Sequence, residues 1–156
     1  LEASYLIFFL RPYYKNVGKQ VIKSPKLYFY DSGIACSLLG IKTTEQLSTH
    51  YLRGGLFEGF IISELMKNDY NHVQTPQMYF WRDKTGHEID VLLESGTTLI
   101  PIEIKAAKTI TSNYFSTLQY WQTLTQKQQQ TWLVYAGNEN QKRNYIQVVV
   151  GRLLQI

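Results

Sequence analysis

One segment constrains the fold of this 156-residue chain more than any other. It is residues 88–105, EIDVLLESGTTLIPIEIK, in which two apolar, β-branched runs flank a Ser-Gly-Thr turn. This pattern predicts a β-hairpin. Each run also carries an acid where a buried strand should be apolar, Asp90 in the first and Glu103 in the second. Because a buried carboxylate is costly unless it is paired, hydrogen-bonded or bound to a metal, the hairpin is a candidate functional site.

The register of the hairpin decides which side chains meet. With a two-residue turn, Gly96 suits the first central position of a type II′ turn. That register places Asp90 opposite Glu103, and it places Glu88 opposite Lys105. Directly opposite residues point to one face of a sheet, as do residues two apart along a strand. We therefore expect Asp90, Glu103 and Lys105 to converge on one face, whereas an odd-numbered loop would require a bulge.

A helix predicted over residues 56–68 carries a third misplaced acid. Its apolar face consists of Phe57, Ile61, Ile62, Leu65 and Met66. On a helical wheel of about 100° per residue, Glu58 falls near the middle of this face, whereas Glu64 lies at its edge and can reach solvent. Glu58 is therefore the wrong residue for a helix that only packs.

The chemistry of these acids favours a cation. Two carboxylates this close cannot comfortably both ionise without one, and Mg²⁺ or Mn²⁺ prefers oxygen ligands. We expect Asp90 and Glu103 to hold the ion, with Glu58 completing the shell directly or through water. Lys105 would then stabilise transition-state charge or orient the attacking water. The alternative is a structural network in which Lys105 neutralises Asp90 or Glu103, but the coincidence of three acids favours the metal site.

The rest of the chain predicts a mixed α/β domain. From residue 56 onward the expected order is a helix (56–68), three strands (77–82, 87–93, 98–105), a helix (from Thr111 or Ser112 to about 126) and two strands (131–136, 145–150). Before it we expect the end of an amphipathic helix (1–10), a short strand (26–30), a helix from the Asp31 cap to about Leu39, a less certain second helix within 41–53, and a break at Gly54-Gly55.

Composition limits the classes of function. The net charge of +4 and the pI of about 9.1 permit nucleic-acid binding without requiring it. The single cysteine, Cys36, excludes an internal disulfide. The sequence has no apolar run of membrane length and no visible signal peptide, so we expect a cytoplasmic protein. The chain opens in mid-pattern with Leu1, which suggests a fragment of a longer protein.

The acidic pattern resembles the PD-(D/E)XK nuclease superfamily. The matching positions are Glu58 on the first core helix, Asp90 on the second core strand, and Glu103 with Lys105 on the third. The proline that precedes the aspartate in the family is replaced by Ile89. The resemblance implies a restriction-endonuclease-like core (helix, three-strand meander, helix, strand, strand) and makes Glu58, Asp90, Glu103 and Lys105 the catalytic residues.

A closer resemblance covers nearly the whole chain. The stretches SPKLYFYDSGIACSLLG, GGLFEGFIISELMK, YFWRDKTGHEIDVLLE and PIEIKAAKT are similar to the C-terminal domain, of unknown function, of a prokaryotic AAA-type ATPase family. This resemblance implies that residues 1–53 are the tail of a small, mostly helical, winged-helix-like segment and that 54–156 are the nuclease-like domain. An ATPase module would precede both and bind ATP. Gly18-Lys19 lacks the remaining residues of a P-loop, so we expect no ATP site of that kind in this chain.

Several basic residues near the predicted site are secondary candidates. Arg82, Lys84 and His87 surround the turn before Asp90, and Lys108 follows the last site strand. They could contact the phosphates of a nucleic acid, although a solvated hairpin tip explains them equally well.

Three functions remain open from the sequence. The first is a Mg²⁺- or Mn²⁺-dependent DNA phosphodiesterase, that is, an endonuclease-type hydrolase. The second is a non-catalytic module that binds DNA or a protein, or mediates self-association, for the attached ATPase. The third is a regulatory or defence ATPase subunit with a relic acidic site. Metal dependence separates the first from the others, and salt-sensitive DNA binding separates nucleic-acid binding from protein binding.

Overall fold

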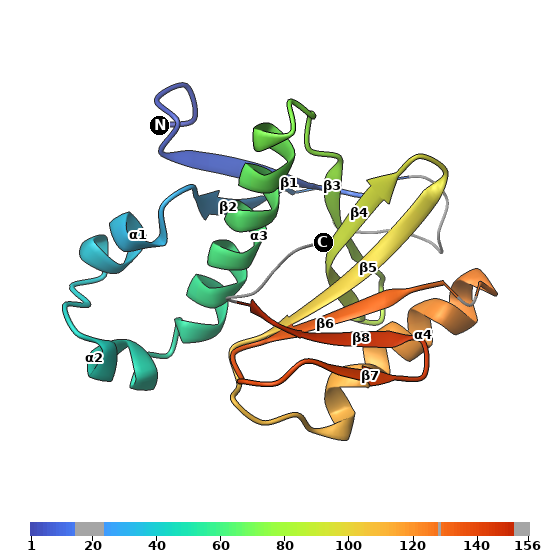
Figure 1. The fold of residues 1–156 in the computed structure, drawn as a ribbon. Coiled ribbons are helices and arrows are strands. Elements are labelled where there is room, and N and C mark those ends of the chain that lie inside the picture. The colour runs from blue at the N-terminus through green and yellow to red at the C-terminus, as the bar shows by residue number, and fades with distance from the viewer. Residues whose placement is uncertain (15–23, 128, 152–156) are drawn as a thin grey trace.

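The computed structural model describes residues 1–14, 24–127 and 129–151, which form one eight-stranded mixed sheet with helices on both sides (Figure 1). The strands are β1 (Ile7–Pro12), β2 (Lys26–Phe29), β3 (Met78–Arg82), β4 (Glu88–Ser95), β5 (Thr98–Lys105), β6 (Thr131–Tyr135), β7 (Gln141–Arg143) and β8 (Ile146–Val150). The helices are α1 (Ser32–Leu38), α2 (Thr44–Thr49), α3 (Arg53–Asn71) and α4 (Ser116–Thr125), with the 3₁₀ turn η1 (Ser112–Phe115) before α4. The strand order across the sheet is β2-β1-β3-β4-β5-β6-β8-β7.

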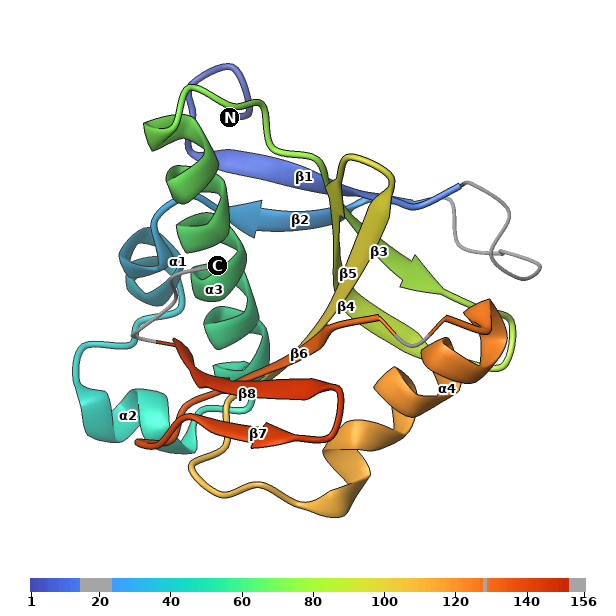
Figure 2. The same cartoon turned by 45° about the vertical axis from the view of Figure 1, so that its right-hand side comes forward.

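The sheet separates two apolar cores, one under α3 and one under α4 (Figure 2). Successive residues of a strand point to opposite faces, so Phe80 packs in the first core and its neighbour Trp81 in the second. The α3 core includes Ile61, Ile62, Leu65, Phe80, Val91, Ile102, Ile104 and Val134. The α4 core includes Trp81, Ile89, Leu92, Leu118, Trp121, Leu133 and Val148. Central strands covered on both faces explain why their sequences are nearly continuous apolar runs.

The predicted helix over residues 1–10 is wrong, because this segment contains the strand β1. β1 pairs antiparallel with β2 and parallel with β3, so the N-terminal residues extend the main sheet. The run Ile-Phe-Phe-Leu has the β-branched and aromatic composition of strands, and Pro12 ends β1, where a missing N–H is tolerated. The description of residues 1–53 as mostly helical is corrected accordingly: they contribute two strands as well as α1 and α2.

The long helix α3 begins earlier than predicted. Gly54 and Gly55 lie in its first turn and do not break the chain before it. The Leu56 N–H already donates to the Leu52 carbonyl at 2.9 Å, although no side chain caps this end. Glycine weakens a helix interior by only about 1 kcal/mol, so the packing of the rest of α3 against the sheet overrides it. The apolar stripe of α3 is buried as predicted at Ile61, Ile62 and Leu65.

The remaining order of elements is confirmed with small changes. Asp31 caps α1 by accepting a hydrogen bond from the Gly33 N–H at 2.7 Å. The helix after Thr111 starts as the 3₁₀ turn η1, and the segment between the last two predicted strands contains the additional short strand β7. The Gly18-Lys19 pair lies in residues 15–23, outside the described part of the chain.

The turn of the β4–β5 hairpin has the predicted type. Ser95 pairs with Thr98, which leaves Gly96 and Thr97 as a two-residue loop. Gly96 has a φ of +58°, and Thr97 is not among the residues with positive φ. A type I′ turn needs a positive φ at both central residues, so the hairpin uses a type II′ turn.

No helix in the described ranges combines the length and apolar character needed to cross a bilayer.

Gly96 has a positive φ and Gly54 lies in a helix, so substitution by alanine should have opposite effects on stability at the two positions. Gly96→Ala places a side chain at a positive φ and should lower the free energy of unfolding by about 1 kcal/mol. Gly54→Ala, in the first turn of α3 with no atom within 4 Å of the added methyl group, should raise it by up to about 1 kcal/mol. Urea denaturation of both variants measures the difference. An unchanged stability in Gly96→Ala would contradict the type II′ assignment.

Candidate active site

A β-bulge lies at Asp90, in the middle of the sheet. The pairing of β3 with β4 shifts register by one residue. The flanking pairs are Tyr79–Leu92 and Trp81–Ile89. One residue of β3 therefore lies opposite two residues of β4, Asp90 and Val91. Bulges bend a strand and re-aim side chains, which explains how a strand with apolar neighbours presents a carboxylate here.

The side chain of Asp90 bonds to β5 at the point where the next backbone pair of the β4–β5 ladder would be expected. The β4–β5 ladder ends at Val91–Ile102, one step before Asp90 would pair with Glu103. Beyond this point the backbone N–H of Ile104 donates to Oδ2 of Asp90 at 2.8 Å. The predicted register is confirmed as far as the ladder runs. Beyond the ladder, Asp90 meets β5 through its side chain and not through a backbone pair with Glu103.

Glu103 and Lys105 form an ion pair along β5. The distance between Lys105 Nζ and Glu103 Oε1 is 2.5 Å. Glu103 is only 4% exposed and Asp90 only 8%, whereas the Lys105 side chain is 32% exposed. The two carboxylates are therefore nearly dry, whereas the Lys105 side chain reaches solvent.

Asp90, Glu103, Glu58 and Lys105 form an acidic cluster, in which each charge shifts the pKa values of its neighbours. Burial raises the pKa of Asp90 well above its usual range, and the charges of Glu103 and Glu58 raise it further. Burial also raises the pKa of Glu103, against the opposing effect of Lys105. Burial lowers the pKa of Lys105, but Asp90 and Glu103 outweigh it and leave the pKa above its ordinary value. Both buried carboxyl groups are thus shifted toward the protonated, neutral form.

Glu58 reaches the cluster from α3, and its closest partners come from β2. Oε1 of Glu58 accepts a hydrogen bond from Lys26 Nζ at 2.9 Å and a short one from the Tyr28 hydroxyl. Lys26 also forms an ion pair with Glu88 at the start of β4. Lys26 and Tyr28 were not among the predicted site residues, because only the pairing of β2 with β1, and of β1 with β3, brings them to the site. Their spacing of two along a predicted strand was the available signal.

One buried carboxylate oxygen of this cluster, Oε2 of Glu103, lacks a hydrogen-bond partner among the described residues. A buried acceptor without a partner costs stability unless an ion or a water satisfies it. No three His, Cys, Asp or Glu side chains in the described ranges are grouped so that they could hold one ion together. Asp90 and Glu103 are therefore the residues that would ligate Mg²⁺ or Mn²⁺, with Glu58 acting through a water.

The turn between β3 and β4 has its own network. Oδ1 of Asp83 accepts from the N–H groups of Thr85 and His87 at 2.8 and 2.9 Å. The His87 ring stacks on Tyr120 with centroids 3.9 Å apart. Burial raises the pKa of Asp83, but hydrogen bonds from Thr85, Tyr120 and His87 outweigh it and lower the pKa to about 2. His87 therefore has a structural role in this turn.

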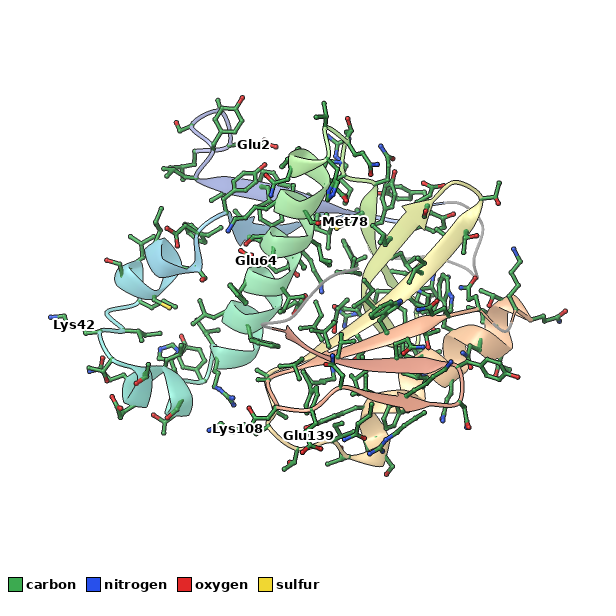
Figure 3. The ribbon with its side chains drawn as sticks, viewed as in Figure 1. Glu2, Lys42, Glu64, Met78, Lys108 and Glu139 are labelled. Carbon is green, nitrogen blue, oxygen red and sulfur yellow. The ribbon has the colours of Figure 1, made fainter. Side chains whose placement is uncertain are left out.

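The other predicted phosphate contacts are dispersed. The guanidinium of Arg82 lies 3.5 Å from Glu88, at the edge of the acidic cluster. Lys84 is exposed in the turn, and Lys108 lies in the loop after β5, at the bottom of the view in Figure 3. Arg82 is thus the one of these four basic residues with an ion pair to the cluster.

Known proteins match the chain in two parts. Residues 53–153 match a domain of unknown function, DUF4143, and residues 1–55 match a second domain of unknown function, DUF8612. Two relatives are 32% identical over 101 residues: the uncharacterized protein Rv2008c of Mycobacterium tuberculosis and the uncharacterized protein Mb2031c of Mycobacterium bovis. The matched region is 64% of this chain but only 22% of each relative. No solved structure matches the chain significantly.

The buried charge of Asp90 predicts a pH-dependent stability. Folding raises the pKa of Asp90, so its protonated carboxyl contributes fully to the free energy of unfolding at a pH below about 4. This contribution is lost as the pH rises through the raised pKa. Asp90→Asn keeps an acceptor for the Ile104 N–H but carries no charge. In EDTA at pH 8 the variant should be more stable than the wild type by about 1–4 kcal/mol, with the difference shrinking toward pH 4.

Urea denaturation between pH 4 and pH 8 checks this expectation, and Mg²⁺ should then stabilise the wild type but not the variant. A variant that is less stable than the wild type at pH 8 in EDTA would show that the Asp90 charge does not destabilise the folded state.

Proposed function

The chain belongs to the DUF4143 family, and from the geometry of its acidic site we propose that it is a metal-dependent DNA phosphodiesterase domain. The observation that carries the proposal is the pair of nearly dry carboxylates, Asp90 and Glu103, with an unpartnered oxygen on Glu103 and a lysine beside it. Networks of this kind that serve only stability are expected to satisfy every buried acceptor.

The roles of the residues follow from their positions. A divalent cation held by Asp90 and Glu103 would polarise a phosphodiester and lower the pKa of a bound water. Lys105, which contacts Glu103 and reaches solvent, would place its charge beside the phosphate oxygens as negative charge accumulates on them. Glu58, fixed by Lys26 and Tyr28, would orient a water of the metal shell. These four residues are thus the proposed catalytic set.

The order of elements supports a nuclease-like core. A helix (α3), a three-strand meander (β3–β5), a second helix (α4) and the parallel strand β6 follow one another as in the restriction-endonuclease-like fold that the sequence resembles. The proposed ligands lie on the central strands β4 and β5, next to the bulge in the β3–β4 pairing. We therefore propose that the chain has this nuclease-like core.

DNA is the proposed substrate because of charge. The chain is basic overall, with a net charge of +4, although its site is acidic. Arg82 at the site, and Lys84 and Lys108 farther away, are the residues expected to contact phosphates. His87 could contribute only from within its turn network.

DUF4143 domains are commonly associated with AAA-type ATPases. The matched region spans about a fifth of the length of the mycobacterial relatives. We propose that an ATPase module acts in cis with this domain in a cytoplasmic protein, and that ATP is bound by that module.

An apolar groove favours a second candidate function, that of a protein-binding or assembly module. The groove has a volume of about 440 Å³ and lies between β2, α1 and the start of α3. Its lining includes Leu27, Leu38, Leu39 and Leu52, each of which is exposed. Exposed apolar grooves commonly bind other proteins. This role does not require the acidic site, so loss of metal binding would not affect it.

Calorimetry with Mn²⁺ and a plasmid-nicking assay test the catalytic proposal together. Glu103→Gln should weaken Mn²⁺ binding by at least about tenfold and abolish nicking, because it removes a ligand charge. Lys105→Met should keep Mn²⁺ binding but slow nicking by about 100-fold or more, because it removes only the transition-state contact. The matched control is Glu64→Gln, on the same helix as Glu58 but paired with Lys67, which should change neither.

A folded wild-type chain that binds no Mn²⁺ would overturn the catalytic proposal. Mn²⁺ binding without nicking of any DNA would favour the assembly role instead.

A further inference from the structure

We propose that Lys26, in β2, is a second phosphate-binding lysine of this site, which contacts the DNA backbone next to the scissile phosphate. The inference rests on the proposed function and adds a residue outside the Glu58, Asp90, Glu103 and Lys105 set. Lys26 lies in the part of the chain that matches DUF8612, so the site would be completed by both matched regions.

The pairing of β2 with β1, and of β1 with β3, fixes the position of Lys26 at the site. Lys26 pairs with Leu10 of β1, and the next residues of β1, Arg11 and Pro12, pair with β3. In this arrangement the Lys26 ammonium lies 5.3 Å from the centre of the Phe80 ring. Phe80 lies next to the bulge, so Lys26 reaches the place where β4 turns away from regular pairing.

The contacts of Lys26 point into the acidic cluster. Its ammonium lies between the carboxylates of Glu58 and Glu88, and its side chain is 25% exposed. A lysine has three N–H donors, and these two carboxylates occupy two of them. A half-buried ammonium group at the edge of a metal site is suited to a phosphate oxygen, because partial desolvation strengthens the contact.

The neighbourhood of Lys26 is built around the same carboxylate oxygen. The Tyr28 hydroxyl donates to Oε1 of Glu58, which also accepts from Lys26. The Tyr28 ring lies against α3 at Gly59, where an added Cβ would stand 3.1 Å from the ring. The missing side chain of Gly59 makes room for the Tyr28 ring. Tyr28 and Gly59 are therefore positioning residues that hold Glu58 and Lys26 together.

The two lysines would approach a bound phosphodiester from different strands. Lys105 extends from β5 beside Glu103, and Lys26 extends from β2 beside Glu58 and Glu88. Lys105 would thus serve the reacting phosphate, and Lys26 an adjacent one.

The salt dependence of DNA binding tests the proposal. A 30-base-pair duplex is titrated with the 156-residue chain in Ca²⁺, over a range of KCl concentrations. Lys26→Met should reduce the slope of log K against log salt by about 0.9, the value of one lost phosphate contact. Lys26→Arg should preserve the slope. The control Lys42→Met, in the exposed connection between α1 and α2 at the left edge of Figure 3, should also preserve it.

Calorimetry with Mn²⁺ separates this role from a structural one. Lys26→Met removes a positive charge from beside the acids, so it should bind Mn²⁺ at least as tightly as the wild type while its nicking rate falls by at least about tenfold. Loss of the fold would instead weaken both.

Two outcomes overturn the proposal in different ways. If the wild type nicks DNA and Lys26→Met keeps its slope and rate, Lys26 is a structural ion-pair residue and the proposed function stands. If the folded wild type binds neither Mn²⁺ nor the duplex, the proposed function fails and the role of Lys26 falls with it.

Discussion

The hydrogen bond from the Ile104 N–H to the Asp90 carboxylate holds the site together. It forms just beyond the last residue pair of the β4–β5 ladder, next to the bulge in the β3–β4 pairing, so a side chain replaces a backbone contact there. Without this bond the Ile104 N–H and the Asp90 carboxylate would both be left without a partner at the edge of the core. The same bond holds Asp90 where the charge of Glu103 raises its pKa, a repulsion that the proposed cation would relieve.

The rest of the structure supplies rigidity around this arrangement. The sheet is covered by α3 on one face and by α4 on the other, so the strands that carry the acids cannot shift without disturbing both cores. The edge strand β2 adds Lys26 and Tyr28, which hold the Glu58 side chain of α3 in place through hydrogen bonds. The proposed chemistry therefore involves residues from both matched regions of the chain, and separating residues 1–53 from the remainder would remove two partners of Glu58.

Local patterns predicted the hairpin well. Gly96 between two β-branched runs defined the turn and the register, and the register brought Asp90 near Glu103. The bulge was not predictable, because one extra residue in a strand leaves no signal in an apolar run. The pairing of Lys26 and Tyr28 with Glu58 was also hidden, because it depends on the long-range pairing of β1 with β3. The helix predicted at the N-terminus failed for the same reason: partners distant in sequence decide whether a short aromatic run becomes a strand.

The central claim is that Asp90 and Glu103 hold one divalent cation. The most direct measurement is an anomalous difference map from crystals of the 156-residue chain soaked in MnCl₂, recorded at the manganese absorption edge. The account predicts a single strong peak about 2.0–2.6 Å from carboxylate oxygens of Asp90 and Glu103, with the peak in contact with Oε2 of Glu103. A map with no peak there, in crystals where Lys105 still contacts Glu103, would mean that the buried acids form a structural network and that the site is not a metal centre.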